Sequence, residues 1–401
     1  MKKLIYPILT AFLLALPSMA WADCPLCDAA EIGDAAKVRA LLANGAEPNT
    51  AGATSTAAGN TETPALMWAA LKNHAGVVQI LLDAGANPNA ENNNGATALI
   101  LAASFSDAEI VKILLNAEAN INAADNKENT ALIYAAKKSN AEIAKMLLDA
   151  GANPNAAGKK KRTALMHAAW HNHPETAKML LDAGANVNAV NNSQNTALMY
   201  AAETGGAETA KMLLDAGANP NIVGHEKWTA LMHAVWHNYP EFVKILLDAG
   251  ANPNAADHNE ITALMHAAKK GHAEIAKMLL DAGVNPNADG WGKWTALMFA
   301  SRYNHPELVK ILLDAGANPN AVNNANNTIL MYAAEEGHVK IVKILVDAGA
   351  DPNTENNNKM TPLMYAVYAG SIETAQILLT AGASPITALI NGYIKAINIL
   401  L

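Results

Sequence analysis

The chain has 401 residues, of which 51% are hydrophobic and only 16% are charged, and its formal net charge is -8. A general nucleic-acid-binding protein should be basic, and a disordered chain should be richer in charge, so both classes are disfavoured. Length alone would suggest two or three domains. The chain is, however, built of sequence repeats, and an array of repeats grows in one dimension and needs no second core.

Residues 1–22 form a segment of their own. Lys2 and Lys3 precede an apolar run over residues 4–16, and small residues at positions 20 and 22 lie where a signal peptidase requires them. This pattern is typical of a secretory signal peptide that is cleaved after Ala22. A retained membrane anchor is the weaker alternative, because a bilayer span needs about 20 apolar residues. We therefore expect a periplasmic or secreted protein with no stable membrane span after signal removal.

The only two cysteines, Cys24 and Cys27, are spaced as Cys-Pro-Leu-Cys at the start of the expected mature chain. An exported protein meets an oxidising compartment, which favours a local disulfide. A redox-active pair would require a strand before it and a βαβ context, so a redox role is only a minor alternative. Two cysteines also cannot complete a zinc site with four protein ligands.

Most of the chain is one segment repeated in constant register. Each repeat opens on a threonine, successive threonines differ by 33 in sequence number, and Pro64 occupies the same register one step earlier. The threonines are Thr97, Thr130, Thr163, Thr196, Thr229, Thr262, Thr295, Thr328 and Thr361. Self-similarity at a period of this size predicts one supersecondary unit stacked into a solenoid.

The unit from Thr262 to Asn287 illustrates the local structure that we expect in every repeat. The Thr262 hydroxyl is placed to cap a first helix, which Gly271 ends, and a second helix follows with apolar residues at helical spacing. Gly283 tolerates the positive φ that ends the second helix, and Pro286 prevents its continuation. Each unit is therefore expected to be a helix-turn-helix followed by a loop.

The motifs Thr-Ala-Leu-Met-x-Ala-Ala, Gly-His-x-Glu-Ile and Leu-Leu-Asp-Ala-Gly-Ala-Asn-Pro-Asn-Ala resemble the ankyrin repeat over nearly the whole chain after the signal segment. The resemblance implies an all-α repeat solenoid of ankyrin repeats, with about eleven repeats and a shortened C-terminal cap. The expected domains are an N-terminal capping repeat (23–49), a flexible inserted loop (50–63), ten repeats (64–385) and shortened capping helices (386–401).

Two departures from the ankyrin pattern affect local stability. Pro362 is the only proline directly after a repeat threonine, and the usual histidine of that motif is a methionine in most repeats, so the family's Thr to His hydrogen bond is missing. Glu118 stands where the family has a glycine after the second helix. A non-glycine residue at positive φ costs on the order of 1 kcal/mol, so we expect a weak point in the third repeat.

Alternate repeats resemble each other more than adjacent repeats do, which superimposes a second period of twice the length. The segments that begin at Trp170, Trp236 and Arg302 match one another, and each of these repeats carries a glycine five residues before its threonine. In ankyrin proteins the loop tips and the ends of the first helices line the concave face that binds partners. The alternating residues fall at those places and form a periodic aromatic and basic face.

We predict that partner binding centres on this face, because aromatic residues and arginine are enriched among the energetic anchors of interfaces. The alternative is that the tryptophans only pack against neighbouring repeats. The predicted binding residues are Trp170, His171, Lys227, Trp228, Trp236, His237, Trp291, Lys293, Trp294, Arg302 and Tyr303.

Neither a metal nor a catalytic site is predicted. The pairs His167 with His171 and His233 with His237 are four residues apart on a helix, but each pair supplies only two ligands. The chain has no Gly-x-Ser-x-Gly, no His-Glu-x-x-His and no phosphate-binding loop. We therefore expect no cofactor and no enzymatic activity.

The function predicted from the sequence is a non-enzymatic, monomeric scaffold in the cell envelope that binds another protein. An alternative is recognition of an extended cell-wall polymer, since regularly spaced aromatic side chains can stack on sugar rings. Nucleic acid is not an expected partner, given the acidic net charge.

Overall fold

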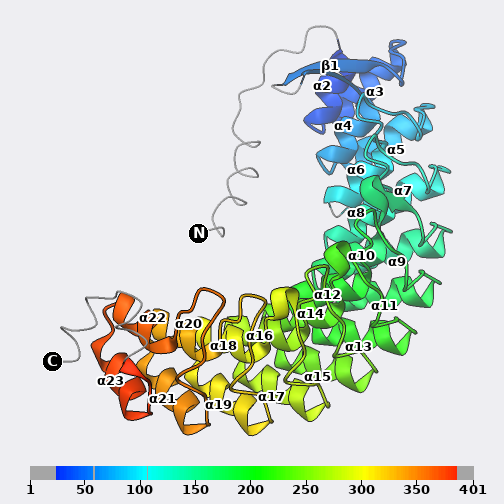
Figure 1. The fold of residues 1–401 in the computed structure, drawn as a ribbon. Coiled ribbons are helices and arrows are strands. Elements are labelled where there is room, and N and C mark those ends of the chain that lie inside the picture. The colour runs from blue at the N-terminus through cyan, green and yellow to red at the C-terminus, as the bar shows by residue number, and fades with distance from the viewer. Residues whose placement is uncertain (1–23, 57–58, 106, 386–401) are drawn as a thin grey trace. The chain divides into compact units, whose positions relative to one another are not determined.

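The computed structural model describes residues 24–56, 59–105 and 107–385, and within them the chain forms 22 α-helices arranged in eleven successive pairs (Figure 1). The predicted signal peptide (1–22) and C-terminal capping helices (386–401) lie outside the described residues. The chain divides into two compact units between Asn192 and Ser193. Among the described residues, no helix has the length and hydrophobicity that a membrane span requires.

The first unit contains five helix pairs, one inserted hairpin and one short two-stranded ladder. Its elements are α2 (Pro25–Glu31), α3 (Ala35–Ala43), β1 (Ala51–Thr56), β2 (Gly59–Pro64), α4 (Ala65–Leu71), α5 (Ala75–Asp83), α6 (Ala98–Phe105), α7 (Ala108–Asn116), α8 (Ala131–Lys137), α9 (Ala141–Asp149), β3 (Ala157–Gly158), the 3-10 turn η1 (Lys159–Lys161), β4 (Arg162–Thr163), α10 (Ala164–Trp170) and α11 (Pro174–Asp182).

The second unit contains six helix pairs. Its elements are α12 (Ala197–Thr204), α13 (Ala207–Asp215), η2 (His225–Lys227), α14 (Ala230–Trp236), α15 (Pro240–Asp248), α16 (Ala263–Lys270), α17 (Ala273–Asp281), η3 (Trp291–Lys293), α18 (Ala296–Arg302), α19 (Pro306–Asp314), α20 (Ile329–Glu335), α21 (Val339–Asp347), α22 (Pro362–Tyr368) and α23 (Ile372–Thr380).

Within each unit the helices form two layers. First helices pack on the first helices of neighbouring repeats, as α4, α6, α8 and α10 do, and second helices pack on second helices, as α5, α7, α9 and α11 do. Leu132 and Ile133 from a first helix, and Ile143 and Leu147 from its partner, are completely or almost completely buried. The apolar stripe of each repeat is therefore covered by its neighbours, which confirms the predicted all-α solenoid.

The residues predicted to begin and end the helices within a repeat are confirmed. The Thr262 hydroxyl accepts a hydrogen bond from the Met265 amide at the start of α16, and Thr130 does the same for Ile133 in α8. Gly271 ends α16 at φ 79, and Gly283 follows α17 at φ 83. Each of these first helices therefore begins on a satisfied amide, and each glycine adopts a backbone conformation that other residues enter only with strain.

Asparagine side chains link the loops of successive repeats. In the first unit Asn122 Oδ1 accepts from the Asn153 amide at 2.8 Å, and Asn155 Oδ1 accepts from the Asn186 amide at 2.7 Å. In the second unit an equivalent bond joins Asn287 Oδ1 to the Asn318 amide, also at 2.7 Å. The recurring asparagine after the second helix thus holds the spacing between these repeats.

The insertion at residues 50–63 differs from the loop that we expected. It forms an antiparallel hairpin in which β1 pairs with β2 from Ala51 opposite Pro64 to Thr56 opposite Gly59. The segment is rich in Ala, Thr and Gly, a composition typical of a linker, but threonine is β-branched and favours extended backbone. The insertion is therefore a structural element of the N-terminal repeat.

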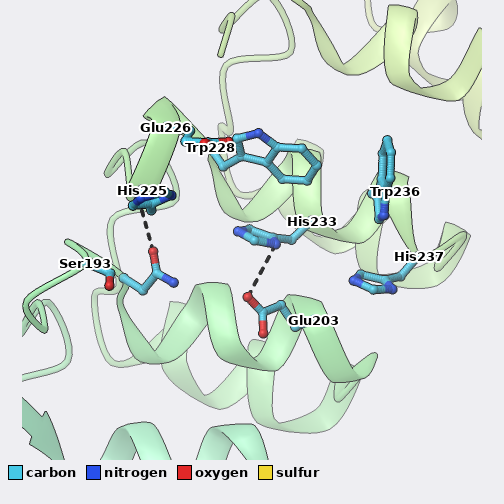
Figure 2. A pocket seen from close by; sticks show the side chains of 9 residues that line it. Ser193, Glu203, His225, Glu226, Trp228, His233, Trp236 and His237 are labelled. Carbon is cyan, nitrogen blue, oxygen red and sulfur yellow. Dashed lines mark hydrogen bonds and ion pairs between the residues drawn. The ribbon is translucent and has the colours of Figure 1, made fainter. Parts of the chain in front are cut away.

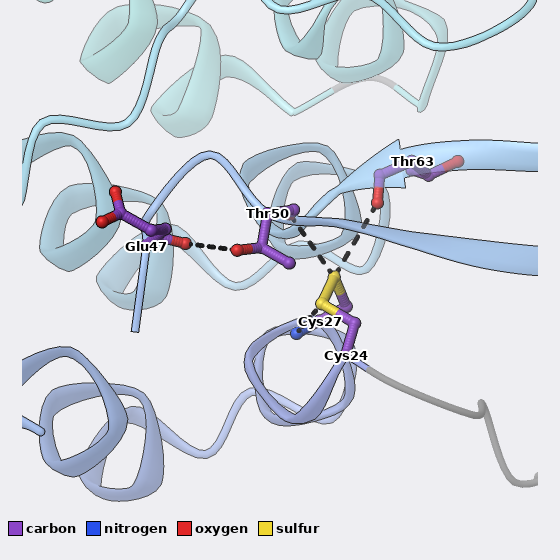
Figure 3. The surroundings of a disulfide bond; sticks show 5 residues. All are labelled: Cys24, Cys27, Glu47, Thr50 and Thr63. Carbon is purple, nitrogen blue, oxygen red and sulfur yellow. Dashed lines mark hydrogen bonds between the residues drawn. A yellow bond between two sulfur atoms is a disulfide. The ribbon is translucent and has the colours of Figure 1, made fainter. Parts of the chain in front are cut away.

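The base of this hairpin packs on the disulfide between Cys24 and Cys27 (Figure 3), which confirms the predicted cystine. Cys27 Sγ lies 3.6 Å from the Thr50 carbonyl oxygen, and because an oxidised sulfur has no hydrogen to donate, this is a packing contact. A side chain at Gly52 would meet both cysteines at 3.2 Å. The two cysteines are only 1% and 4% exposed, so their burial supports a structural staple over the redox alternative.

The predicted weak point in the third repeat has the expected backbone conformation. Glu118 has φ 58, whereas the glycines at the equivalent position in the adjacent repeats, Gly85 and Gly151, have φ 87 and 94. A Cβ on Gly151 would contact nothing within 4 Å, so only the backbone conformation opposes a side chain there.

Replacing Glu118 with glycine should stabilise the protein by about 0.5 to 1 kcal/mol, because relief of positive-φ strain exceeds the added entropy of the unfolded chain. The matched variant Gly151→Ala should lose about 1 kcal/mol for the opposite reason. Urea unfolding followed by circular dichroism measures both. A lower midpoint for Glu118→Gly would contradict this explanation of the weak point.

Candidate functional site

Loops of two kinds alternate from the repeat of Thr130 to the repeat of Thr328. In one kind an Asp or Asn lies five residues before the repeat threonine and closes the turn, as Asp125 does by accepting hydrogen bonds from the amides of Lys127 and Asn129 at 2.9 Å. Its second oxygen accepts from the Tyr134 hydroxyl at 2.6 Å. The loop is thus tied to the aromatic residue four positions after the threonine, which we call the slot residue.

In the other kind of loop, a glycine replaces the Asp or Asn. At Gly224 an added Cβ would lie 2.8 Å from Met199 Sδ, and at Gly290 it would lie 2.8 Å from Met265 Sδ, so a side chain at either position would force its neighbour to shift. A 3-10 turn follows each of these glycines, and the residue before the threonine is an Arg or a Trp. These large side chains lie against the slot residues instead of an Asp or Asn.

The most extensive aromatic cluster surrounds Trp228 in the second unit. Measured between ring centroids, Trp228 lies 5.0 Å from His233 in its own repeat and 4.8 Å from His266 in the next repeat. Trp236 meets the Trp228 ring edge-on, with the centroids 5.6 Å apart. Lys270 Nζ lies 3.7 Å from the centroid of the Trp236 ring. Two repeats are thus joined by ring contacts and a cation-π contact.

A second cluster surrounds Trp294 in the same unit. The centroid of the Trp294 ring lies 5.0 Å from that of Phe299 and 4.8 Å from that of Tyr332. The guanidinium carbon of Arg302 is 5.4 Å from the centroid of the Tyr332 ring. The predicted residues Trp291 and Tyr303 lie nearby and are 70% and 45% exposed. Buried and exposed aromatic side chains are therefore combined at one place.

In the first unit, Arg162 takes the position that Trp228 and Trp294 hold in the second. Its guanidinium carbon lies 5.4 Å from the ring of Trp170, which is 38% exposed. The His171 ring is stacked with both His167 and His173, at 6.4 and 5.6 Å. The predicted residues Trp170 and His171 thus belong to a basic cluster.

A cavity of about 490 Å³ opens beside the Trp228 cluster (Figure 2). Glu203 projects toward it from α12, with a carboxylate oxygen 3.5 Å from His233 Nδ1, while Trp228 lies over the other side of His233. The His225 amide donates to Asn195 Oδ1 at 3.2 Å and closes one end. The cavity is lined by residues of two successive repeats, which are Ser193, Asn195, Glu203, His225, Glu226, Trp228, His233, Trp236 and His237.

Burial keeps two histidines of these clusters neutral. It is the main cause that lowers the pKa of His233 to about 4, with smaller contributions from His237 and His266, and it prevails although Glu203 is close. Burial and the charges of Arg162 and Lys137 likewise lower the pKa of His167 to about 4. Both side chains are therefore uncharged at pH 7.

The predicted site residues fall into two groups. Trp228, Trp236 and Trp294 are half-buried between repeats, so they pack and also keep part of their surface exposed, whereas Trp170, Trp291 and Tyr303 are exposed. Lys227 and Lys293 are exposed at loop tips with φ 60 and 61. His237 stacks on Tyr239, and Arg302 lies on the Trp294 cluster.

The sequence prediction missed Glu203, Glu226, Phe299 and Tyr332, which line the same cavities or clusters. A signal for the last two was present, because the position four residues after each repeat threonine is aromatic or histidine from Tyr134 onward. The carboxylates gave no such signal, since they come from another repeat or a loop tip.

The paired histidines of the first unit, His167 and His171, face each other in a stack. Within the described part of the chain, no group of three or more His, Cys, Asp or Glu side chains is placed to hold a metal ion.

Replacing His233 with phenylalanine, which the chain itself uses at the equivalent Phe299, should reduce acid sensitivity. The pKa of His233 is about 4 when folded and 6.5 in the unfolded chain, so the unfolded chain binds more protons between these values and stability falls as pH falls. Between pH 7 and 5 the variant should lose about 1 to 2 kcal/mol less than the parent, measured by urea unfolding at both pH values.

The reciprocal variant Phe299→His should lose more stability than the parent over the same pH interval, because it adds a half-buried histidine beside Arg302. An unchanged pH dependence in both variants would show that burial at this position does not control histidine protonation.

Comparison with known proteins agrees with the helix pairs and their capping residues. A family model described as ankyrin repeats, three copies, matches the chain six times, over residues 26–125, 66–158, 120–191, 165–257, 231–323 and 316–388. A search of curated proteins finds no match to the chain. Because the matched segments together extend from residue 26 to residue 388, the chain belongs to the ankyrin repeat family.

Proposed function

We propose that this protein is a non-enzymatic scaffold that binds another protein through the face built from its first helices and loop tips. Ankyrin repeats suggest a protein interaction scaffold, and the proposal assigns no catalytic residue and no cofactor. The proposed binding residues are those of the alternate repeats, from Trp170 to Tyr303. The scaffold is proposed to act as a monomer.

The observation that carries the proposal is the exposure of large aromatic side chains on these repeats. Trp291 is 70% exposed although tryptophan is mostly buried in proteins, and Tyr303 is 45% exposed beside it. Lys269 Nζ lies 5.9 Å from the Tyr303 ring, which adds a cation at the edge of this patch. Aromatic anchors surrounded by polar groups are typical of the energetic centres of protein interfaces.

A photo-crosslinking amino acid at position 291 or 303 should capture the same partner protein in intact cells, identified by mass spectrometry. The same amino acid at position 372, where the parent Ile372 is 55% exposed at the start of a second helix, should not capture it. The double variant Trp291→Ala with Tyr303→Ala should reduce recovery of that partner by about tenfold or more.

Equal capture from both faces, or recovery that is unchanged in the double variant, would overturn the proposal. An extended cell-wall polymer is the alternative occupant, because exposed tryptophans can also stack on sugars. It would give no protein crosslink at positions 291 and 303 and would carry the protein into the pellet with purified wall material.

We also infer that the scaffold acts in the cell envelope, in the periplasm or after secretion. The inference is supported by the signal-like sequence of residues 1–22 and by a cystine immediately after it. Cell fractionation should recover a chain outside the cytoplasm that starts at Asp23 and resists alkylation until it is reduced. A chain that keeps Met1 and remains with the cytoplasmic fraction would contradict this location.

A further inference from the structure

The cavity beside Trp228 has a counterpart two repeats earlier in the chain. In the first unit a cavity of about 330 Å³ lies between the loops and first helices of two successive repeats. Seven of its described lining residues occupy the same repeat positions as residues that line the second-unit cavity. The pairs are Lys127 and Ser193, Asn129 and Asn195, Lys137 and Glu203, Lys159 and His225, Lys160 and Glu226, Arg162 and Trp228, and His167 and His233.

The charge of the cavity is reversed between the two copies. Among the described residues that line it, the first-unit cavity has five cationic side chains and no carboxylate: Lys127, Lys137, Lys159, Lys160 and Arg162. The described lining of the second-unit cavity includes the carboxylates of Glu203 and Glu226 and no Lys or Arg. Since the backbone frame is shared, the difference lies in what each cavity can bind.

The walls of the second-unit cavity suit a cation. Trp228 and Trp236 meet at 72°, which makes an aromatic corner, and the faces of such rings attract positive charge. Glu203 lies across His233 from Trp228 (Figure 2), and its side chain is only 23% exposed, so its charge is incompletely screened by water. His233, with a pKa of about 4, adds no positive charge at pH 7.

The cavity has two carboxylates in its described lining, and basic groups lie at its edge. Lys270 Nζ, from the next repeat, lies 3.7 Å from the centroid of Trp236, so this ring already carries an ammonium group, whose charge opposes a second cation beside it. His258 Nδ1 lies 3.9 Å from Glu226 Oε2, and it offsets the negative charge of that carboxylate only when the imidazole is protonated. The cavity thus combines two acidic side chains with aromatic surface, whereas its counterpart combines cations with a histidine and Tyr134.

We propose that the cavity formed by Glu203, Glu226, Trp228 and Trp236 binds a lysine or arginine side chain of the partner protein. That the cationic side chain belongs to a partner protein rests on the proposed scaffold function, but binding of a cationic group to the cavity does not depend on that function. The counterpart cavity, with its reversed charge, provides the internal comparison.

The test is a titration of the full protein at pH 7 with N-acetyl-arginine amide and, separately, with N-acetyl-glutamate amide. The indole N–H signals of Trp228 and Trp236 are followed by nuclear magnetic resonance and assigned with Trp→Phe variants. The arginine compound should shift both signals in a saturable way, and added salt should weaken its binding. The glutamate compound should leave both signals unchanged.

The matched variant is Glu203→Lys combined with Glu226→Lys, which installs the residue types found at Lys137 and Lys160. It should bind the arginine compound about tenfold more weakly or not detectably, because two attractive charges become repulsive. The isosteric variant Glu203→Gln should give an intermediate loss. Unchanged positions of the other indole signals and an unchanged thermal midpoint would show that the variants fold.

Equal shifts with both compounds, or unchanged affinity for the arginine compound in the folded double variant, would overturn the proposal. These outcomes are independent of crosslinking at positions 291 and 303. Partner capture there without arginine binding would remove only the assignment of this cavity, and arginine binding without partner capture would remove only the scaffold function.

Discussion

The structure depends on one constraint, which is that a single helix pair cannot bury its own apolar stripe. Leu132 and Ile133 are buried only because the neighbouring first helices cover them, and Leu147 depends on neighbouring second helices in the same way. Each repeat must therefore keep the same length and register as the next. The bond from the Asn153 amide to Asn122 Oδ1 joins the loops of two successive repeats, so a slip of one residue between them would break it.

Because the register is fixed, the amino-acid sequence varies between repeats mainly at positions that are not buried between stacked helices. The buried leucine at 132 recurs unchanged as Leu198 and Leu264. By contrast, the residue five before the threonine alternates between a turn-closing Asp or Asn, such as Asp125, and a glycine such as Gly224. Where the glycine removes the polar partner of the slot residue, a Trp or Arg covers that residue instead. The aromatic clusters are consequently an alternative way to close the same loop, and they also present surface.

Much of the fold could be predicted from the sequence, because its determinants are local and repeat: the Thr262 cap, the glycine at 283 and the helical spacing of apolar residues all act within one unit. The hairpin at residues 50–63 could not be predicted in this way, because its strands occur once and its packing partner, the cystine, lies at the start of the repeat. The candidate site was predicted in part. The periodic tryptophans marked its position, but Glu203 belongs to the preceding repeat and meets His233 only through the stacking of successive repeats.

The same constraint explains how one repeat block could diverge in binding without losing stability. Lys137 and Lys160 are exposed, and their counterparts Glu203 and Glu226 are at least partly exposed, so exchanging their charge changes few buried contacts. The exchange of Arg162 for Trp228 is more demanding, because the indole must fit against His233 and His266. A side chain at Gly158 would meet Asn129, and one at Gly224 would meet Asn195 and Met199, so the same glycine suits the loop in both copies. The loop glycine is therefore common to both copies, and the charges around the cavity distinguish what each copy can bind.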